Sequence, residues 1–215
     1  MADITFYTNP MSRGRIVRWM LEELGQPYDT VVVTYGPEMQ GPDYRSINPM
    51  AKVPAVRHGD AVVTEAAAIC AYLSEAFPDA GLAPAPGTPA RAAFLRWMFF
   101  GAGPVEAAAT NSAFGWTPSG PQEEGRVGYG SLKRVCDTLE AQLQHGPFLL
   151  GAEFSAVDVY LGSQIMWGIQ FETLEKRPAF LEYSKRMGGR AAAVRAREID
   201  DALMAEQAAQ EQGGA

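Results

Sequence analysis

The stretch that decides the fold reads Asn48-Pro49-Met50-Ala51-Lys52-Val53-Pro54, followed by a short strand, Ala55-Val56-Arg57, and then by Thr64-Glu65-Ala66. A proline that opens a strand donates no ladder hydrogen bond, and its preceding peptide bond is readily held cis. A cis Pro54 would leave the amide and carbonyl of Val53 pointing outward. Lys52 and Glu65 add one cation and one anion, which together suit a small zwitterionic peptide. An ordinary strand-edge proline before an acidic helix start is the alternative, and this stretch alone leaves both open.

Composition excludes several classes of protein. The chain has 215 residues, of which 47% are hydrophobic and 20% charged, as in ordinary globular proteins of one large or two modest domains. A net charge of -7 argues against a nucleic-acid partner. No apolar run approaches the roughly 20 residues of a membrane span, and the N-terminus lacks a signal-peptide pattern, so we expect a cytoplasmic protein. Cys70 and Cys136 are too isolated to predict a disulfide framework or a metal site.

A Pro-, Gly- and Ala-rich segment divides the chain. We expect one domain at residues 1–78, a linker at 79–89 and a second domain at 90–215. In the first, strand and helix patterns alternate as βαβ, loop, ββα, which predicts a mixed sheet with helices packed on it. Strands are expected at residues 4–7, 28–34, 54–57 and 61–63, and helices at 13–24 and 65–77.

The second domain shows helical patterns only, so the predicted fold class is α/β plus all-α. We expect a kink at Pro104, where proline interrupts a helix, and a frayed tail from about residue 207. Ser155 and Asp158 have the spacing of a capping box, a structural motif whose loss typically costs ~1 kcal/mol. Helices are expected at residues 89–113, 123–144, 157–169 and 178–187.

Ser12 lies between the first strand and the first helix, where it could cap that helix. A sulfur anion there would meet a hydroxyl donor and the positive end of the helix dipole. Lowering a thiol pKa from ~8.5 to ~6.5 needs about 2.7 kcal/mol. A hydrogen bond to a charged group supplies ~1.5–3 kcal/mol and a helix end ~0.3–1 more. Ser12 as a cap and nothing else remains the alternative. Tyr7 is the rival hydroxyl for the sulfur anion, although a packing role in the strand is favoured for it. Arg13 and Arg15 could add positive potential, but such residues are more often solvated or interface charges.

These motifs together resemble the cytosolic glutathione transferases, specifically bacterial, serine-type (theta- or beta-like) members. The resemblance covers nearly the whole chain and implies a thioredoxin-like domain followed by a helical domain. It rests on the strand ending at Tyr7, the loop to Ser12, and the segments quoted above. The helical domain adds Pro147-Phe148-Leu149-Leu150-Gly151, Phe154-Ser155 and Asp158, which look like the family's folding signature.

The resemblance implies a role for each residue at the glutathione site. Ser12 would face the glutathione sulfur. Val53, before cis Pro54, would pair its backbone with the cysteinyl part, and Lys52 would meet the glycyl carboxylate. Glu65 would hold the γ-glutamyl amine. Ala66 stands where the family usually has Ser or Thr, so only its backbone amide is left for the γ-glutamyl carboxylate. Gln40 is a weak candidate for the glycyl end.

A second-substrate pocket between the domains is also implied, although core packing is the alternative for each residue. Trp116 is favoured because it lies in a Gly- and Pro-rich loop. The candidates are Met11, Phe99, Phe100, Phe114, Trp116 and Trp167. The implied function is a glutathione S-transferase, which moves alkyl or aryl groups other than methyl, with glutathione as co-substrate, no permanently bound cofactor, and a homodimeric state. A glutathione-dependent reductase, peroxidase or ether-cleaving enzyme, and a non-catalytic glutathione-binding or interaction module, are the alternatives.

Overall fold

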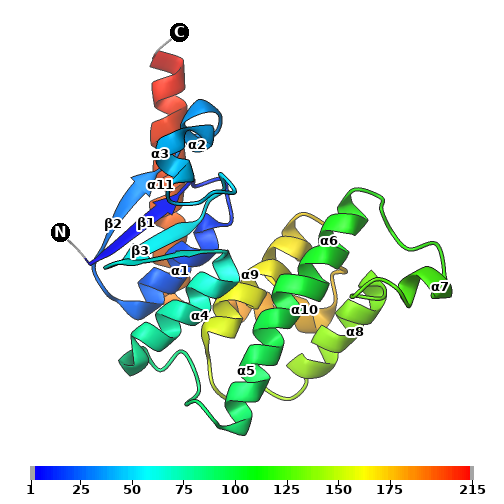
Figure 1. The fold of residues 1–215 in the computed structure, drawn as a ribbon. Helices are drawn as coiled ribbons and strands as arrows, with labels where there is room; N and C mark the ends of the chain where they lie inside the picture. Colours follow the sequence, from blue (N-terminus) through cyan, green and yellow to red (C-terminus); the bar gives the residue numbers. More distant parts are fainter. Residues whose placement is uncertain (1–2, 214–215) are drawn as a thin grey trace. The chain divides into compact units, whose positions relative to one another are not determined.

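The computed structural model describes residues 3–213, and their contacts form two compact units (Figure 1). The first unit combines Met1–Ala80 with Gly189–Ala215, and the second is Gly81–Gly188. This division differs from the expected one, which assigned everything after residue 89 to the helical domain. The physical reason is that the last helix packs along the first helix of the N-terminal unit.

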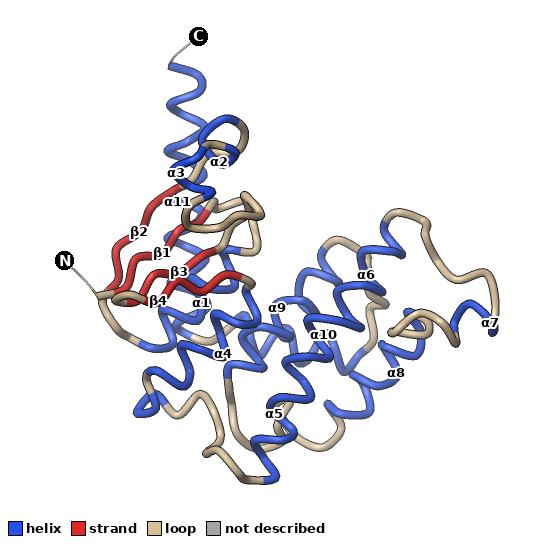
Figure 2. The backbone as a smooth tube through the Cα atoms, viewed as in Figure 1, coloured by secondary structure: helices blue, strands red, loops and turns tan. Residues whose placement is uncertain are grey.

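The N-terminal unit is built on a four-stranded mixed sheet. Its strands are β1 (Ile4–Thr8), β2 (Tyr28–Val32), β3 (Ala55–His58) and β4 (Ala61–Thr64), in the order β2-β1-β3-β4 (Figure 2). β1 is parallel to β2 and antiparallel to β3, which is antiparallel to β4. The predicted βαβ-ββα arrangement is confirmed.

Two expected helices pack on this sheet, α1 (Gly14–Leu24) and α4 (Ala66–Ala76). The apolar stripe of α1 is buried, and the helix ends at Gly25, whose φ of 65° favours glycine. The loop before β3 contains two short helices that were not predicted, α2 (Pro37–Gln40) and α3 (Pro42–Arg45). A 3₁₀ turn, η1 (Pro78–Ala80), closes this part of the unit.

The last helix, α11 (Ala191–Gly213), was not predicted and packs along α1 (Figure 1). Its buried face near the start consists of Ala192, Ala193 and Ala196, small residues that give a weak periodic signal. A frayed tail was expected from about residue 207, and in the structure the backbone is helical through residue 213. The remainder of the expected tail, residues 214–215, lies outside the described residues.

The helical unit contains α5 (Pro89–Phe100), the π-helical turn η2 (Gly101–Val105), α6 (Glu106–Ala113), α7 (Pro121–Glu124), α8 (Leu132–Leu143), α9 (Ala156–Gln170) and α10 (Pro178–Gly188). At Pro104, where a kink was predicted, the regular α-helix gives way to this π-helical turn. The helix expected from residue 123 starts later, because a glycine-rich turn follows α7. Ser131 then caps α8 by accepting from the amide of Arg134. Leu82, within the expected linker, is buried, and its carbonyl accepts from the amide of Ala156.

The capping box at the start of α9 is confirmed. Asp158 is fully buried and accepts four hydrogen bonds: from the amides of Leu149 and Ser155, and from the hydroxyls of Ser155 and Tyr183. Burial raises the pKa of this carboxyl, and the donors partly offset the rise. No helix within residues 3–213 is both long and apolar enough to cross a membrane.

Candidate functional site

One edge of the sheet brings together the predicted glutathione residues of the N-terminal unit. Ala55 pairs with Tyr7 on one side and with Thr64 on the other. Three segments therefore leave the sheet at this edge: the turn after β1, the loop before β3, and the start of α4 after β4. These segments carry Ser12, Lys52 with Val53, and Glu65 with Ala66 respectively. Residues far apart in sequence thus share one edge, as the prediction requires.

The loop that carries Lys52 and Val53 is shaped by two buried polar side chains. Asn48 donates from Nδ2 to the Lys52 carbonyl at 2.7 Å and accepts from the Met50 amide at 3.0 Å. The Tyr44 hydroxyl donates to the same Lys52 carbonyl at 2.7 Å. These bonds turn the chain back toward the sheet and leave the Lys52 side chain exposed, with no ion pair to any residue between 3 and 213.

Val53 precedes the cis proline that the sequence predicts, and its backbone groups are left unpaired within residues 3–213. The Val53–Pro54 peptide bond is cis. Within the described part of the chain, the amide and carbonyl of Val53 have no hydrogen-bond partner. The Val53 side chain packs against a buried cluster of Val33, Met39 and Tyr44. The free backbone groups therefore sit on a packed base and can bind an extended peptide in the manner of an added strand.

Tyr7 belongs to the same base of the site. Its ring lies 6.1 Å from that of Tyr44, and it packs against the Val33–Met39–Tyr44 cluster. Burial, with Tyr7 as a second cause, raises the pKa of Tyr44 to about 12. The packing role expected for Tyr7 is the one its contacts support. Tyr44 stays protonated and donates to the loop.

Glu65 has the backbone strain that marks functional positions. It precedes α4 with φ of 66° and ψ of 117°, is exposed, and makes no side-chain cap to the helix. A non-glycine residue in such a region costs on the order of 1–3 kcal/mol. A structural cap would have used Ser, Thr, Asp or Asn in extended backbone. The carboxylate of Glu65 is therefore exposed and not used as a cap of α4.

Ala66 is the first residue of α4 and is buried. Its amide has no partner among residues 3–213, as expected for the first turn of a helix. An anion at this point would meet the positive end of the helix dipole. The carboxylate of Glu65 and the amide of Ala66 therefore offer opposite polarity side by side, which matches an α-amino acid head group.

Ser12 lies in a tight turn whose hydroxyl is already engaged. Its O–H donates to the Asn9 carbonyl at 2.6 Å, and its Oγ accepts from the Gly14 amide at 2.9 Å. The cap position of α1 is Arg13, so the expected cap is off by one residue, although Ser12 still binds a first-turn amide. Gly14 is required, because a Cβ there would clash with the Thr8 hydroxyl.

Asn9 builds the turn and was not predicted. It is buried, donates from Nδ2 to the Val33 carbonyl at 3.1 Å, and accepts from the Met11 amide at 3.0 Å. The Asn-Pro dipeptide after a strand is a turn signal that could have found it. Asn48, in the second Asn-Pro dipeptide, builds the loop before β3 in a similar way. Tyr44 had no comparable local signal, since its role depends on packing between distant segments.

Two weaker predictions concern Gln40 and the residues of the second-substrate pocket. Gln40 is exposed, but its side-chain carbonyl accepts from Arg45 at 2.7 Å.

Of the expected pocket residues in the helical unit, Phe114 and Trp116 stack 4.8 Å apart, and each is 65% exposed. Phe99 is also exposed, Phe100 packs edge-on against Trp97, and Trp167 is partly buried. Met11, in the other unit, is 63% exposed. Their meeting in one pocket stays a prediction.

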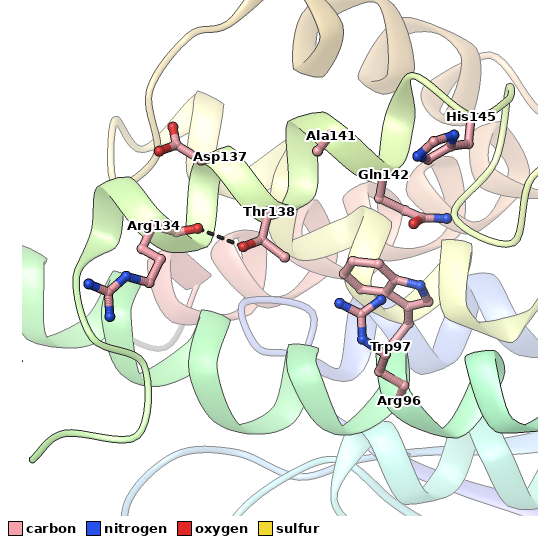
Figure 3. A pocket seen from close by; sticks show the side chains of 8 residues that line it. All are labelled: Arg96, Trp97, Arg134, Asp137, Thr138, Ala141, Gln142 and His145. Atoms are coloured by element: carbon pink, nitrogen blue, oxygen red, sulfur yellow. Dashed lines mark hydrogen bonds between the residues drawn. The ribbon is translucent and has the colours of Figure 1, made fainter. Parts of the chain in front are cut away.

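The helical unit also contains a groove of about 400 Å³ between α5 and α8 (Figure 3). Within the lining, the Arg96 guanidinium lies 4.2 Å from the centroid of the Trp97 ring. None of the predicted site residues lines this groove. Among residues 3–213 there is also no cluster of His, Cys, Asp and Glu suited to a metal ion. The groove is lined by Arg96, Trp97, Arg134, Asp137, Thr138, Ala141, Gln142 and His145.

The mixed sheet and the two units define a class of protein, in which a thioredoxin-like unit is joined to a helical unit. Family models agree. The model of the glutathione S-transferase N-terminal domain matches residues 11–76, and that of the C-terminal domain matches residues 60–186. The chain belongs to the glutathione S-transferase family.

The individual relatives share less than a third of their residues with this chain. Glutathione S-transferase GstA of Escherichia coli O157:H7 is 28% identical over 175 residues, which cover 77% of this chain and 79% of GstA. A glutathione transferase structure from Methylococcus capsulatus superposes with a TM-score of 0.75 at 29% identity, covering 92% of this chain and 98% of that one. A homologue from Sulfitobacter with bound glutathione gives 0.72 at 27% identity and the same coverage.

Proposed function

We propose that this chain is a glutathione transferase that activates the glutathione thiol and conjugates it to an apolar electrophile. The observation that carries the proposal is the sheet edge on which three separate segments present complementary groups. Lys52 meets the glycyl carboxylate, the Val53 backbone pairs with the cysteinyl residue, and Glu65 holds the γ-glutamyl amine. The Ala66 amide receives the γ-glutamyl carboxylate without the usual hydroxyl, so glutathione has one hydrogen bond fewer here.

Ser12 stabilises the thiolate by turning its hydroxyl proton from the Asn9 carbonyl to the sulfur. The exchange is inexpensive, because the Asn9 carbonyl keeps a second donor, the Ser12 amide, at 3.0 Å. A hydrogen bond to an anion is worth ~1.5–3 kcal/mol, against ~0.5–1.5 for the neutral bond that is given up. The amide of Gly14 meanwhile remains on Oγ and increases the acidity of the hydroxyl.

Ser12→Ala tests this role. Removing the hydroxyl should raise the pKa of bound glutathione by about 1–2 units, because one charge-assisted hydrogen bond of ~1.5–3 kcal/mol is lost. Conjugation of a general aryl halide at neutral pH should fall accordingly. The measurement is thiolate absorbance against pH, together with kcat. Ser131→Ala, which removes a serine cap in the helical unit, is the matched control and should leave the thiol pKa unchanged. Full kcat and an unshifted thiol pKa in Ser12→Ala would rule out this role.

Glu65→Gly separates the strain from the function. Glycine adopts positive φ without penalty, so this variant should be more stable by about 1 kcal/mol in urea denaturation. Loss of the carboxylate should at the same time weaken glutathione binding by about tenfold or more, because the γ-glutamyl amine loses its charged partner. Calorimetric titration gives the affinity. Unchanged affinity would remove Glu65 from the site.

The electrophile pocket is the less specified part of the proposal. The exposed Phe114–Trp116 stack is the best candidate for an apolar wall, with Met11, Phe100 and Trp167 as further contributors. We also expect a homodimer in the cytoplasm, as the family resemblance implies. Light scattering on the eluted protein gives the mass, and a monomer at micromolar concentration would contradict the dimer.

A further inference from the structure

Arg15 connects the Ser12 turn to the last helix of the chain. From the first turn of α1, its Nε donates to the Pro10 carbonyl at 2.6 Å. Its Nη2 donates to Oδ1 of Asp201 at 2.7 Å and contacts the sulfur of Met204. Asp201 and Met204 lie on α11, far along the sequence. One guanidinium therefore bridges the active-site turn and the C-terminal helix.

The geometry of α11 explains how it reaches this turn. Arg190 and Arg195 pair with Glu23 and Glu22 near the end of α1. Asp200 and Asp201 pair with Arg18 and Arg15 near its start. The two helices therefore run antiparallel. These ion pairs set the register between them, and this register places Asp201 beside the first turn of α1. The position of Asp201 beside Arg15 is thus determined by the packing of the whole helix.

The bond from Arg15 to the Pro10 carbonyl links α11 to the position of the Ser12 hydroxyl. Pro10 follows Asn9, whose carbonyl accepts the Ser12 hydroxyl proton, and it precedes Ser12 by two residues. Movement of the Pro10 peptide would shift both the Asn9 carbonyl and the Ser12 Oγ. An arginine suits this task, because its planar fork fixes two acceptors in one plane, whereas a lysine offers a single ammonium group.

We propose that Arg15 is a positioning residue through which α11 sets the geometry of the Ser12 hydroxyl toward the glutathione sulfur. The inference rests on the proposed role of Ser12. Arg15 does not touch the sulfur in this scheme. Its charge is matched by Asp201, so its contribution is geometric rather than a free positive potential. The pair is also partly solvated, with side chains 25% and 58% exposed, and so contributes little to overall stability.

Three variants test the connection from both sides: Arg15→Ala, Arg15→Lys and Asp201→Ala. In Arg15→Ala, the pKa of bound glutathione should rise by about half a unit, and kcat/KM should fall about threefold, because a displaced donor loses part of its effect on the thiolate. Arg15→Lys should behave like Arg15→Ala, since the charge is kept but the fork is lost. Asp201→Ala should show a smaller change in the same direction. Arg197→Ala, an exposed arginine elsewhere on α11, is the control and should match the wild type.

The double variant Ser12→Ala/Arg15→Ala makes the result decisive. If Arg15 acts through the hydroxyl, the thiol pKa of the double variant should equal that of Ser12→Ala alone. Additive shifts, or a wild-type pKa in Arg15→Lys, would mean that Arg15 acts by charge, and would overturn the inference. A normal thiol pKa in Arg15→Ala would overturn it as well. If Ser12→Ala itself leaves the pKa unchanged, it is the proposed role of Ser12 that fails.

Discussion

Asp200→Ala is expected to destabilise the N-terminal unit by about 3–5 kcal/mol, the cost of leaving a buried charge without its partner. Arg18 and Asp200 form an ion pair at 3.1 Å between α1 and α11, and each side chain is 1% exposed. Without Asp200, the Arg18 guanidinium would remain buried against the rings of Phe6 and Tyr28, with only neutral acceptors. Urea denaturation measures the loss, and hydrogen exchange of the α1 amides localises it.

The neighbouring carboxylate provides the matched control. Asp201→Ala removes a partly solvated pair on the same helix and should cost at most about 1 kcal/mol. The two adjacent aspartates thus separate stability from activity: Asp200 is expected to affect unfolding, and Asp201 the thiol pKa. Equal destabilisation by both variants would contradict this assignment.

The buried Arg18–Asp200 pair leaves polar atoms without hydrogen bonds to other residues between 3 and 213. Replacing both residues by apolar ones should therefore restore part of the stability that is lost when Asp200 alone is removed. Nη2 of Arg18 and Oδ2 of Asp200 are both buried without a hydrogen-bond partner among the described residues. Burial raises the pKa of Asp200, although Arg18 opposes the rise. The double variant Arg18→Met/Asp200→Leu should therefore recover most of the stability lost in Asp200→Ala, because it removes both unpaired atoms and fills the space. A double variant no more stable than the single one would show that the charge pair itself holds α11.

Asp158→Ala is the second large effect, expected to cost more than about 3 kcal/mol in the helical unit. The substitution removes a helix cap and leaves the amides of Leu149 and Ser155 and the hydroxyl of Tyr183 buried, at ~1–3 kcal/mol for each unpaired group. Ser131→Ala, at the exposed cap of α8, should cost about 1 kcal/mol in the same urea experiment. A similar loss in both variants would argue against a special role for the Asp158 network.

The pH dependence of the Asp158 network has a definite sign. Burial raises the pKa of this carboxyl in the folded chain above its unfolded value of ~3.9. Between these two values the folded chain binds more protons, so the contribution of Asp158 to stability falls as pH rises. Asp158→Asn lacks this titration. The stability gap between the wild type and Asp158→Asn should therefore narrow as pH rises from about 4, and a widening gap would contradict the raised pKa.

Much of the fold was predictable from local rules. The strands followed from β-branched runs, the cis peptide bond from Val-Pro at a strand start, and the capping box from the spacing of Ser155 and Asp158. The interruption at Pro104 followed from the missing amide of proline. Each of these depends on a few neighbouring residues, whose backbone preferences are the same in many folds.

The predictions failed where packing between distant segments determines the structure. α11 was missed because its buried face is made of alanines, whose small contribution to burial gives little periodic contrast. The start of α8 was misplaced because an apolar pattern continues through the glycine-rich turn. Arg15 was expected to be a solvated or interface charge. The tertiary structure shows instead that it donates to the Pro10 carbonyl and to Asp201 of α11.

The sequence by itself determined where the proposed peptide site lies, because Lys52, Val53, Pro54 and Glu65 lie close to short strands whose pairing is nearly forced by their order. Only the tertiary structure decided which unit the C-terminal helix joins and which carboxylate pairs with Arg15. Both depend on contacts between segments nearly the whole chain apart, where no local preference constrains the partner and the balance of burial and charge pairing selects it.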